Sequence, residues 1–124
     1  MILVDEAHQF MKMKFDSLRK IISEGRMFGV GMFLSTQNLS DFKADEDYSS
    51  FIKSWVIHNV GTVKTSDMNS IFGPDPDNDR YQKFISQAKK FESICKIGTQ
   101  SPVFMKDLPY YKLIEEDERF KEQK

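Results

Sequence analysis

The sequence predicts an α/β protein with three layers, in which a mainly parallel sheet lies between helices and the chain closes with a C-terminal β-hairpin. A short apolar run, Ile2–Val4, lacks polar alternation, which is typical of a central strand covered on both faces. Strand-like and helix-like segments then alternate, the order of crossover units in a parallel sheet. Finally, residues 91–97 and 102–106 are strand-like and are separated by a loop of hairpin size.

The first helix is predicted over residues 15–24, and Gly25 ends it. Its apolar residues recur at helical spacing and share one face: Phe15, Leu18, Ile21 and Ile22. Residues 29–35 are the second strand candidate. A polar group follows at its C-terminal end: Ser35, Thr36, Gln37 and Asn38.

The rhythm of strands and helices continues through the second half of the chain. The expected elements are a short helix over 48–53, a third parallel strand over 55–60, a helix capped by Thr65 or Ser66 that ends near Phe72, a break over 73–77, and a helix capped by Asp77 or Asn78 that runs through Lys90. Residues 115–124 are almost wholly charged. We therefore expect a domain over 1–110 and a charged tail over 111–124, frayed as a helix or disordered.

Composition excludes several classes of protein. A chain of 124 residues fits one domain. A net charge of −1 gives no bulk attraction to nucleic acid or anionic lipid. No apolar run approaches the roughly 20 residues that cross a bilayer, so no membrane insertion is expected. Cys95 is the only cysteine, which excludes an internal disulfide and a cysteine zinc cluster and favours the cytoplasm.

Two adjacent carboxylates, Asp5 and Glu6, follow the first strand directly. Nucleotides bind at the carboxyl edge of parallel sheets. There Asp5 could hold Mg²⁺, directly or through a water molecule, because Mg²⁺ prefers hard oxygen ligands and keeps part of its hydration. Glu6 could polarise an attacking water. Apolar residues followed by Asp-Glu form the Walker B pattern, although the same letters also suit an acidic helix N-cap.

The surrounding motifs make the pattern more specific. Residues 2–8 read Ile-Leu-Val-Asp-Glu-Ala-His, residues 24–26 read Glu-Gly-Arg, residues 28–31 read Phe-Gly-Val-Gly, and residues 35–37 read Ser-Thr-Gln. In this order and spacing they resemble the HerA and FtsK class of hexameric ATPases, including the related VirB4 and TrwB-like motors of conjugation. The resemblance covers residues 1 to about 42, weakens afterwards, and returns over 98–106. It implies a partial RecA-like P-loop NTPase fold.

The resemblance also implies roles for individual residues. Asp5 would hold Mg²⁺, Glu6 would activate water, and Gln37 would sense the γ-phosphate of ATP. Arg26 would act as a finger on the neighbouring subunit's nucleotide, an effect worth about 10³ to 10⁵ in rate in other NTPases. In isolation, Arg26 also suits a surface arginine that pairs with Glu24 or with aspartates, and Gln37 suits a strand-end residue that satisfies a loop backbone.

One departure from the family decides the expected activity. The 124 residues contain no Gly-x-x-x-x-Gly-Lys-Ser/Thr loop to hold the β and γ phosphates. The chain therefore looks like the C-terminal half of a motor domain, which would need an N-terminal half carrying Walker A. The full parent, a hexamer, would couple ATP hydrolysis to the translocation or processing of DNA. The isolated chain is expected to be inactive.

Two other interpretations remain open on the residues alone. Residues 5–8 also spell the Asp-Glu-Ala-His box of superfamily 2 helicases, but the later arginine-rich motif of those enzymes has no counterpart here. A partial α/β fold could instead be a non-catalytic interaction module that covers its open strands by dimerising. His8 and His58 are fifty residues apart, and we interpret them as unrelated polar residues rather than metal ligands.

Overall fold

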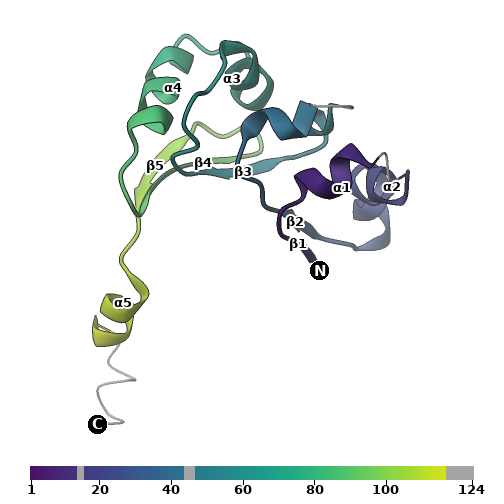
Figure 1. Ribbon diagram of the computed structural model, residues 1–124, viewed down its shortest axis with the longest axis horizontal. Helices are drawn as coiled ribbons and strands as arrows, with labels where there is room; N and C mark the ends of the chain where they lie inside the picture. The colour runs from purple at the N-terminus through teal and green to yellow at the C-terminus, as the bar shows by residue number, and fades with distance from the viewer. Residues whose placement is uncertain (14–15, 44–46, 117–124) are drawn as a thin grey trace.

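The computed structural model describes residues 1–13, 16–43 and 47–116. Their elements form two small sheets with helices beside them (Figure 1). In chain order they are β1 (Ile2–Val4), α1 (His8–Lys12), α2 (Asp16–Glu24), the 3-10 helix η1 (Gly25–Phe28), β2 (Met32–Leu34), the 3-10 helices η2 (Leu39–Lys43) and η3 (Tyr48–Ser50), β3 (Ser54–Ile57), α3 (Thr65–Phe72), α4 (Asn78–Gln87), β4 (Glu92–Ile97), β5 (Val103–Lys106) and α5 (Tyr110–Glu116).

The first sheet is the predicted parallel pair. β1 and β2 run parallel with Leu3 opposite Phe33, and α1 and α2 make the crossover between them. The backbone pairing continues past the strands, because Ser35 N–H donates to the Val4 carbonyl at 2.9 Å and Ala7 N–H donates to the Ser35 carbonyl at 2.8 Å. This pairing holds the residues after β1 and the residues after β2 at one edge of the sheet.

The prediction that the first strand is central and covered on both faces is wrong for the described residues. β1 pairs only with β2 there, and Leu3 is 70% exposed. The helix predicted over 15–24 is observed as α2, with Leu18 buried and Ile21 and Ile22 half-buried. Phe15, predicted on the same face, lies outside the described residues. After Gly25 the backbone continues as η1 before it turns into β2.

The prediction of a mainly parallel sheet is also wrong for the described residues. The third predicted strand is β3, but it pairs antiparallel with β4 instead of joining β1 and β2. β4 pairs antiparallel with β5 through the predicted hairpin, whose loop has Gly98 at φ 55°. A side-chain pattern marks a strand but does not choose its partner. Here the long β4 takes β3 along one edge and β5 along the other.

Helices α3 and α4 cover one face of the three-stranded sheet (Figure 1). Ile57 and Ile94 lie opposite each other on this face and are 3% and 1% exposed. They pack in one cluster with Met68 of α3 and Ile85 of α4. The opposite face carries Val56, Ile97 and Val103, each more than half exposed. Among the described residues this sheet therefore has helices on one face only, and a three-layer, RecA-like arrangement is not confirmed.

The remaining helices differ from the sequence predictions mainly at their ends. The helix expected over 48–53 is the short η3, and α3 spans Thr65–Phe72 with Lys64, not Thr65 or Ser66, at its N-cap. Asp77 is the N-cap of α4, which ends at Gln87 rather than Lys90. α5 begins at Tyr110, and the rest of the predicted charged tail, 117–124, lies outside the described residues. None of the described helices has the length and apolar character needed to cross a membrane.

Candidate functional site at the carboxyl edge of the parallel strands

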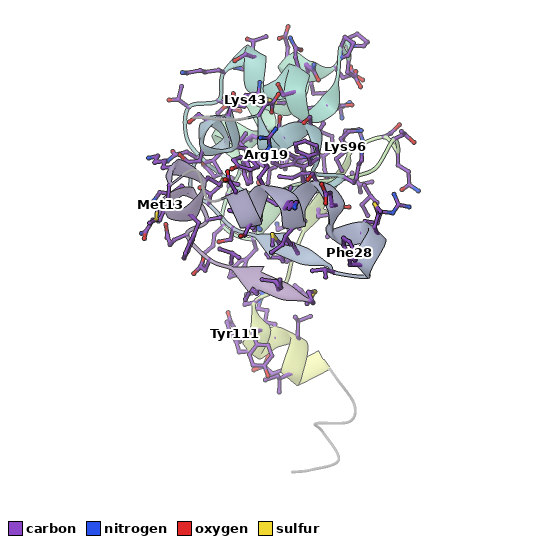
Figure 2. All side chains as sticks on the ribbon, turned by 90° about the vertical axis from the view of Figure 1, so that its right-hand side faces the viewer. Met13, Arg19, Phe28, Lys43, Lys96 and Tyr111 are labelled. Carbon is purple, nitrogen blue, oxygen red and sulfur yellow. The ribbon has the colours of Figure 1, made fainter. Side chains whose placement is uncertain are left out.

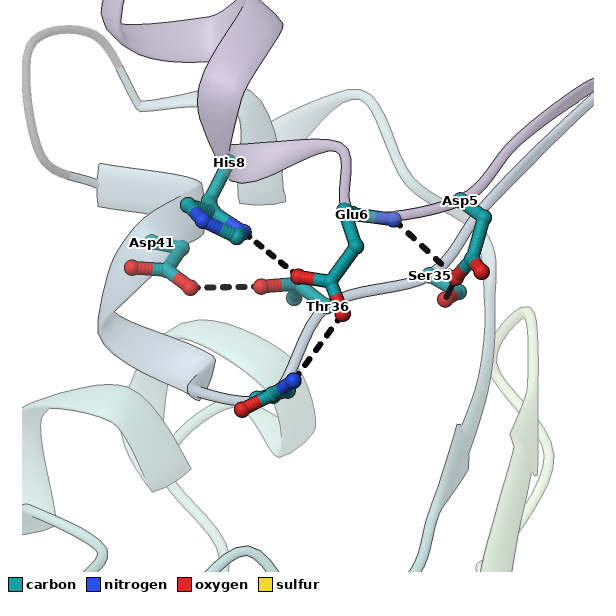
Figure 3. Close-up of polar contacts among 7 residues, drawn as sticks. Asp5, Glu6, His8, Ser35, Thr36 and Asp41 are labelled. Atoms are coloured by element: carbon teal, nitrogen blue, oxygen red, sulfur yellow. Dashed lines mark hydrogen bonds and ion pairs between the residues drawn. The ribbon is translucent and has the colours of Figure 1, made fainter.

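The carboxyl ends of β1 and β2 bring together residues that are thirty positions apart in the sequence (Figure 3). Asp5 and Glu6 follow β1, while Ser35 and Gln37 follow β2. Because the strands are parallel, both groups lie at the same edge of the sheet. Three of the four residues singled out from the sequence meet here: Asp5, Glu6 and Gln37.

Asp5 is exposed, and its carboxylate is fixed by two donors. The Ser35 hydroxyl and the Glu6 backbone N–H both donate to Oδ1, the latter at 3.0 Å. These bonds stabilise the ionised form, so the Ser35 hydroxyl first, and the Glu6 amide second, lower the pKa of Asp5 below its usual value. Oδ2 receives no hydrogen bond from a described residue. A fixed, ionised carboxylate with one open oxygen is suited to a cation or to water.

The Glu6 side chain is held between two residues. Gln37 Nε2 donates to Glu6 Oε1 at 2.9 Å, and His8 Nδ1 lies 3.3 Å from Oε2. The second contact has the distance of an ion pair but is not a hydrogen bond. His8 Nδ1 is buried and has no hydrogen-bond partner in the described structure. Glu6 also has φ 52°, the left-handed region that residues with a Cβ rarely adopt. Such strain is typical of functional sites.

The turn after β2 is fixed by a further polar contact. The Thr36 hydroxyl donates to an Asp41 carboxylate oxygen, and Asp41 belongs to η2 (Figure 3). In the same 3-10 helix, the buried ring of Phe42 packs edge-on against Trp55 of β3, with 5.0 Å between ring centroids. The segment that presents Gln37 is therefore anchored in the core at its far end.

Arg26 does not join this cluster. It is exposed in η1, which precedes β2, so it lies toward the amino end of the strand whose carboxyl end carries Gln37. Figure 2 places Met13, just after α1, and Phe28, the last residue of η1, on opposite sides of the molecule. The nine residues of α2, about 13 Å of helix, separate the two ends of the crossover. Arg26 therefore lies at the other end of the crossover from Asp5 and Glu6.

Metal binding at this edge would depend on few protein ligands. The described residues contain no group of three or more His, Cys, Asp or Glu side chains placed to hold a metal ion. Mg²⁺ commonly takes only one or two carboxylates and completes its shell with water and phosphate oxygens. The single open oxygen of Asp5 is enough for Mg²⁺ bound in this way. A structural zinc or calcium site needs more protein ligands than the described residues bring together here.

Two residues of the site escape prediction from the sequence. The pattern presents His8 as an unrelated polar residue and Ser35 only as part of a polar strand end, yet both contact the acidic pair directly. The one signal in the sequence that could have identified Ser35 is the register of the two parallel strands. In a parallel pair, the residue after β2 lies beside the residue after β1, which places Ser35 next to Asp5.

Comparisons with known proteins do not assign the chain to a family. No protein-family model matches it, and a search of curated proteins finds no significant match.

Proposed function

We propose that this chain is the Walker B to sensor part of a HerA- or FtsK-like ATPase domain. The observation that carries the proposal is the hydrogen bond from Gln37 to Glu6, which joins the ends of two parallel strands beside Asp5. Carboxyl edges of parallel strands are where α/β proteins bind nucleotides. The resembled family places its magnesium ligand, water-activating carboxylate and γ-phosphate sensor in this relation.

Each residue has a definite task in this proposal. Asp5 holds Mg²⁺, which would neutralise charge on the phosphates of bound ATP. Glu6 orients and polarises the attacking water. Gln37, whose amide holds Glu6 in the structure, can exchange that contact for the γ-phosphate and so report nucleotide occupancy. Arg26, at the other end of the crossover, neutralises charge in the site of the next subunit.

The proposed activity belongs to an assembly that includes more than these residues. The phosphate-binding loop must come from residues outside the 124, because the sequence contains none. Arg26 acts only if subunits form a ring, for which the family implies a hexamer. In that assembly, hydrolysis would drive translocation or processing of DNA. We propose ATP with Mg²⁺ as the cofactors and the cytoplasm as the location.

The test uses the polypeptide that carries these residues in its source cells. We would tag its gene at the 3′ end, purify the product with its natural partners, and measure Mg²⁺-dependent phosphate release from ATP. Glu6→Gln should lower kcat by about 10² or more while ATP still binds, because a general base contributes about that much. Glu115→Gln, the same change at an exposed position of α5, is the matched control and should leave kcat unchanged.

A mixing experiment tests the role of Arg26 across subunits. Glu6→Gln and Arg26→Ala subunits should each be inactive alone. Mixed rings should regain activity, because some interfaces combine an intact Glu6 with an intact Arg26. A purified assembly that neither binds nor hydrolyses ATP would refute the proposed function, and mixtures without recovery would refute the assignment of Arg26 alone.

A second candidate function is a non-catalytic interaction module. The observation that favours it is the apolar surface left open on both sheets, including Leu3 at 70%, Phe33 at 53% and Val103 at 59% exposure. Surfaces of this kind on isolated strands tend to be covered by another chain. Light scattering decides whether the chain covers these surfaces by dimerising. A dimer at micromolar concentration supports this function, and a monomer counts against it.

A further inference from the structure

A shallow groove lies between α4 and β5. It has a volume of about 410 Å³ and is lined by Arg80, Lys83, Phe84 and Gln87 of α4 and by Phe104 of β5. The four helical residues follow the spacing of one helix face. The two phenylalanine rings lie 4.6 Å apart between centroids, and the Arg80 guanidinium sits 5.1 Å from the Phe104 centroid. The floor is aromatic and the rim is cationic.

The groove lies directly beside an open strand edge. β5 is the last strand of its sheet and pairs only with β4 in the described structure. In an antiparallel pair, alternate residues point their N–H and C=O groups away from the partner strand. Residues 103–106 therefore present backbone groups at the spacing that a further strand would need. α5, which follows β5, extends away from the sheet on the side opposite α4 (Figure 1).

The two faces of this edge differ in chemistry. On the α4 face, the groove carries two cations and no carboxylate, and Lys106 lies on the same face two residues after Phe104. On the other face, the exposed residues of β5 are Val103 and Met105. A strand added here would send alternate side chains to each face, so it would meet positive charge on one and apolar surface on the other.

We propose that the β5 edge and the α4 groove bind an extended peptide whose residues alternate between acidic and aliphatic side chains. Backbone pairing with β5 supplies affinity, and the two faces supply specificity. The acidic residues face Arg80 and Lys83, while the aliphatic ones cover Val103 and Met105. A strand suits the site better than nucleic acid does, because the open edge offers backbone donors and acceptors and the rim holds only two cations.

The test measures binding of labelled peptides to the full 124-residue chain by fluorescence anisotropy. The probe is acetyl-EVEVEV-amide. The first peptide control is acetyl-EEEVVV-amide, which keeps the charge but loses the alternation. The second control is a pair of N-methylated probes, one methylated at the backbone nitrogens of the glutamates and the other at those of the valines. The methyl groups remove the N–H donors that pairing with β5 would use. The alternating peptide should bind, and both controls should lose at least about tenfold in affinity.

Charge variants locate the site. Changing both Arg80 and Lys83 to glutamate should lower the affinity of the chain for the probe peptide at least about tenfold. Changing Lys12 and Lys20, which are exposed on α1 and α2, to glutamate changes the net charge by the same amount. This control should keep the affinity for the probe within about twofold of that of the unchanged chain. All four positions are exposed, and matching thermal melts check that the variants fold.

Three outcomes would overturn the proposal. The block peptide or the N-methylated peptides could bind as well as the probe, which would mean that no strand is added. Both double reversals could weaken binding equally, which would mean that only net charge acts. An oligothymidylate could bind with strong salt dependence and lose affinity on reversal of Arg80 and Lys83 while the peptide does not bind, which would assign the groove to single-stranded nucleic acid.

Discussion

At the residue scale, the candidate site consists of short polar contacts around two carboxylates that differ in character. Asp5 keeps one oxygen open, whereas both oxygens of Glu6 are engaged by Gln37 and His8. A bound cation therefore has direct access to the open oxygen of Asp5, while Gln37 and His8 already lie against the two oxygens of Glu6. This difference matches the tasks that the proposed function gives them.

The first prediction concerns the acid–base behaviour of Asp5. The Ser35 hydroxyl, as the larger cause, lowers the pKa of Asp5, so Ser35→Ala should raise that pKa toward the ordinary value of 3.8. The ionised form is favoured in the fold, so its contribution to stability is present above the unfolded pKa and is lost as pH falls through the lower folded pKa. Carbon-13 NMR titration of the Asp5 carboxyl measures the shift. Ser23→Ala, whose hydroxyl caps carbonyls within α2, should leave the titration unchanged.

The second prediction concerns the backbone of Glu6. Its φ of 52° disfavours any residue with a Cβ, so Glu6→Gly should be more stable than Glu6→Ala by about 1 kcal/mol. Both variants lose the carboxylate, so their difference isolates the backbone. Urea unfolding measures it. At Lys20, inside α2, the same pair should rank in the reverse order, with alanine the more stable. If alanine is the more stable residue at both positions, the backbone of Glu6 carries no strain in solution.

At the element scale, the chain shows which features a single sequence predicts. The strands β1, β2, β4 and β5, the helix α2, and the convergence of Asp5 with Gln37 are all predictable from local patterns, because periodicity is local and parallel strands share an edge. The partner of β3 is not, because a residue pattern such as Trp55-Val56-Ile57 is the same in either orientation. The role of His8 depends on an atom-to-atom approach that no pattern encodes.

The third prediction tests the one-sided covering of the antiparallel sheet. Ile94 and Ile97 are on the same strand, yet Ile94 is 1% exposed and Ile97 is 55% exposed. Ile94→Ala should lower the free energy of unfolding by about 2 to 5 kcal/mol, because it leaves a cavity under α3 and α4. Ile97→Ala should cost less than about 1 kcal/mol. Equal losses in urea unfolding would mean that something covers the outer face in solution.

At the scale of the whole molecule, one core joins the two sheets, while the residues to which the proposed function gives roles remain apart. Met11 beside the parallel pair and Ile94 in the antiparallel sheet belong to the same buried cluster, so the acidic edge is fixed relative to the rest of the fold. The cations that the two proposals use lie elsewhere. Arg26 is at the other end of the crossover, and Arg80 and Lys83 line the groove on α4. Under the proposed function, charge neutralisation at Asp5 and Glu6 is therefore assigned to bound Mg²⁺ and to Arg26 of a neighbouring subunit.

The last prediction rests on that separation. We expect the 124-residue chain alone to release phosphate from Mg²⁺-ATP no faster than its Glu6→Gln variant. Two carboxylates without a phosphate-binding loop or a nearby cation repel the triphosphate rather than bind it. Colourimetric phosphate release over a range of protein concentrations tests this, since a ring that formed would bring Arg26 to a neighbour's site. A Mg²⁺-dependent turnover that Glu6→Gln abolishes would contradict it. The acidic edge would then bind the triphosphate without a Walker A loop, and the partner that the proposed function requires would be unnecessary.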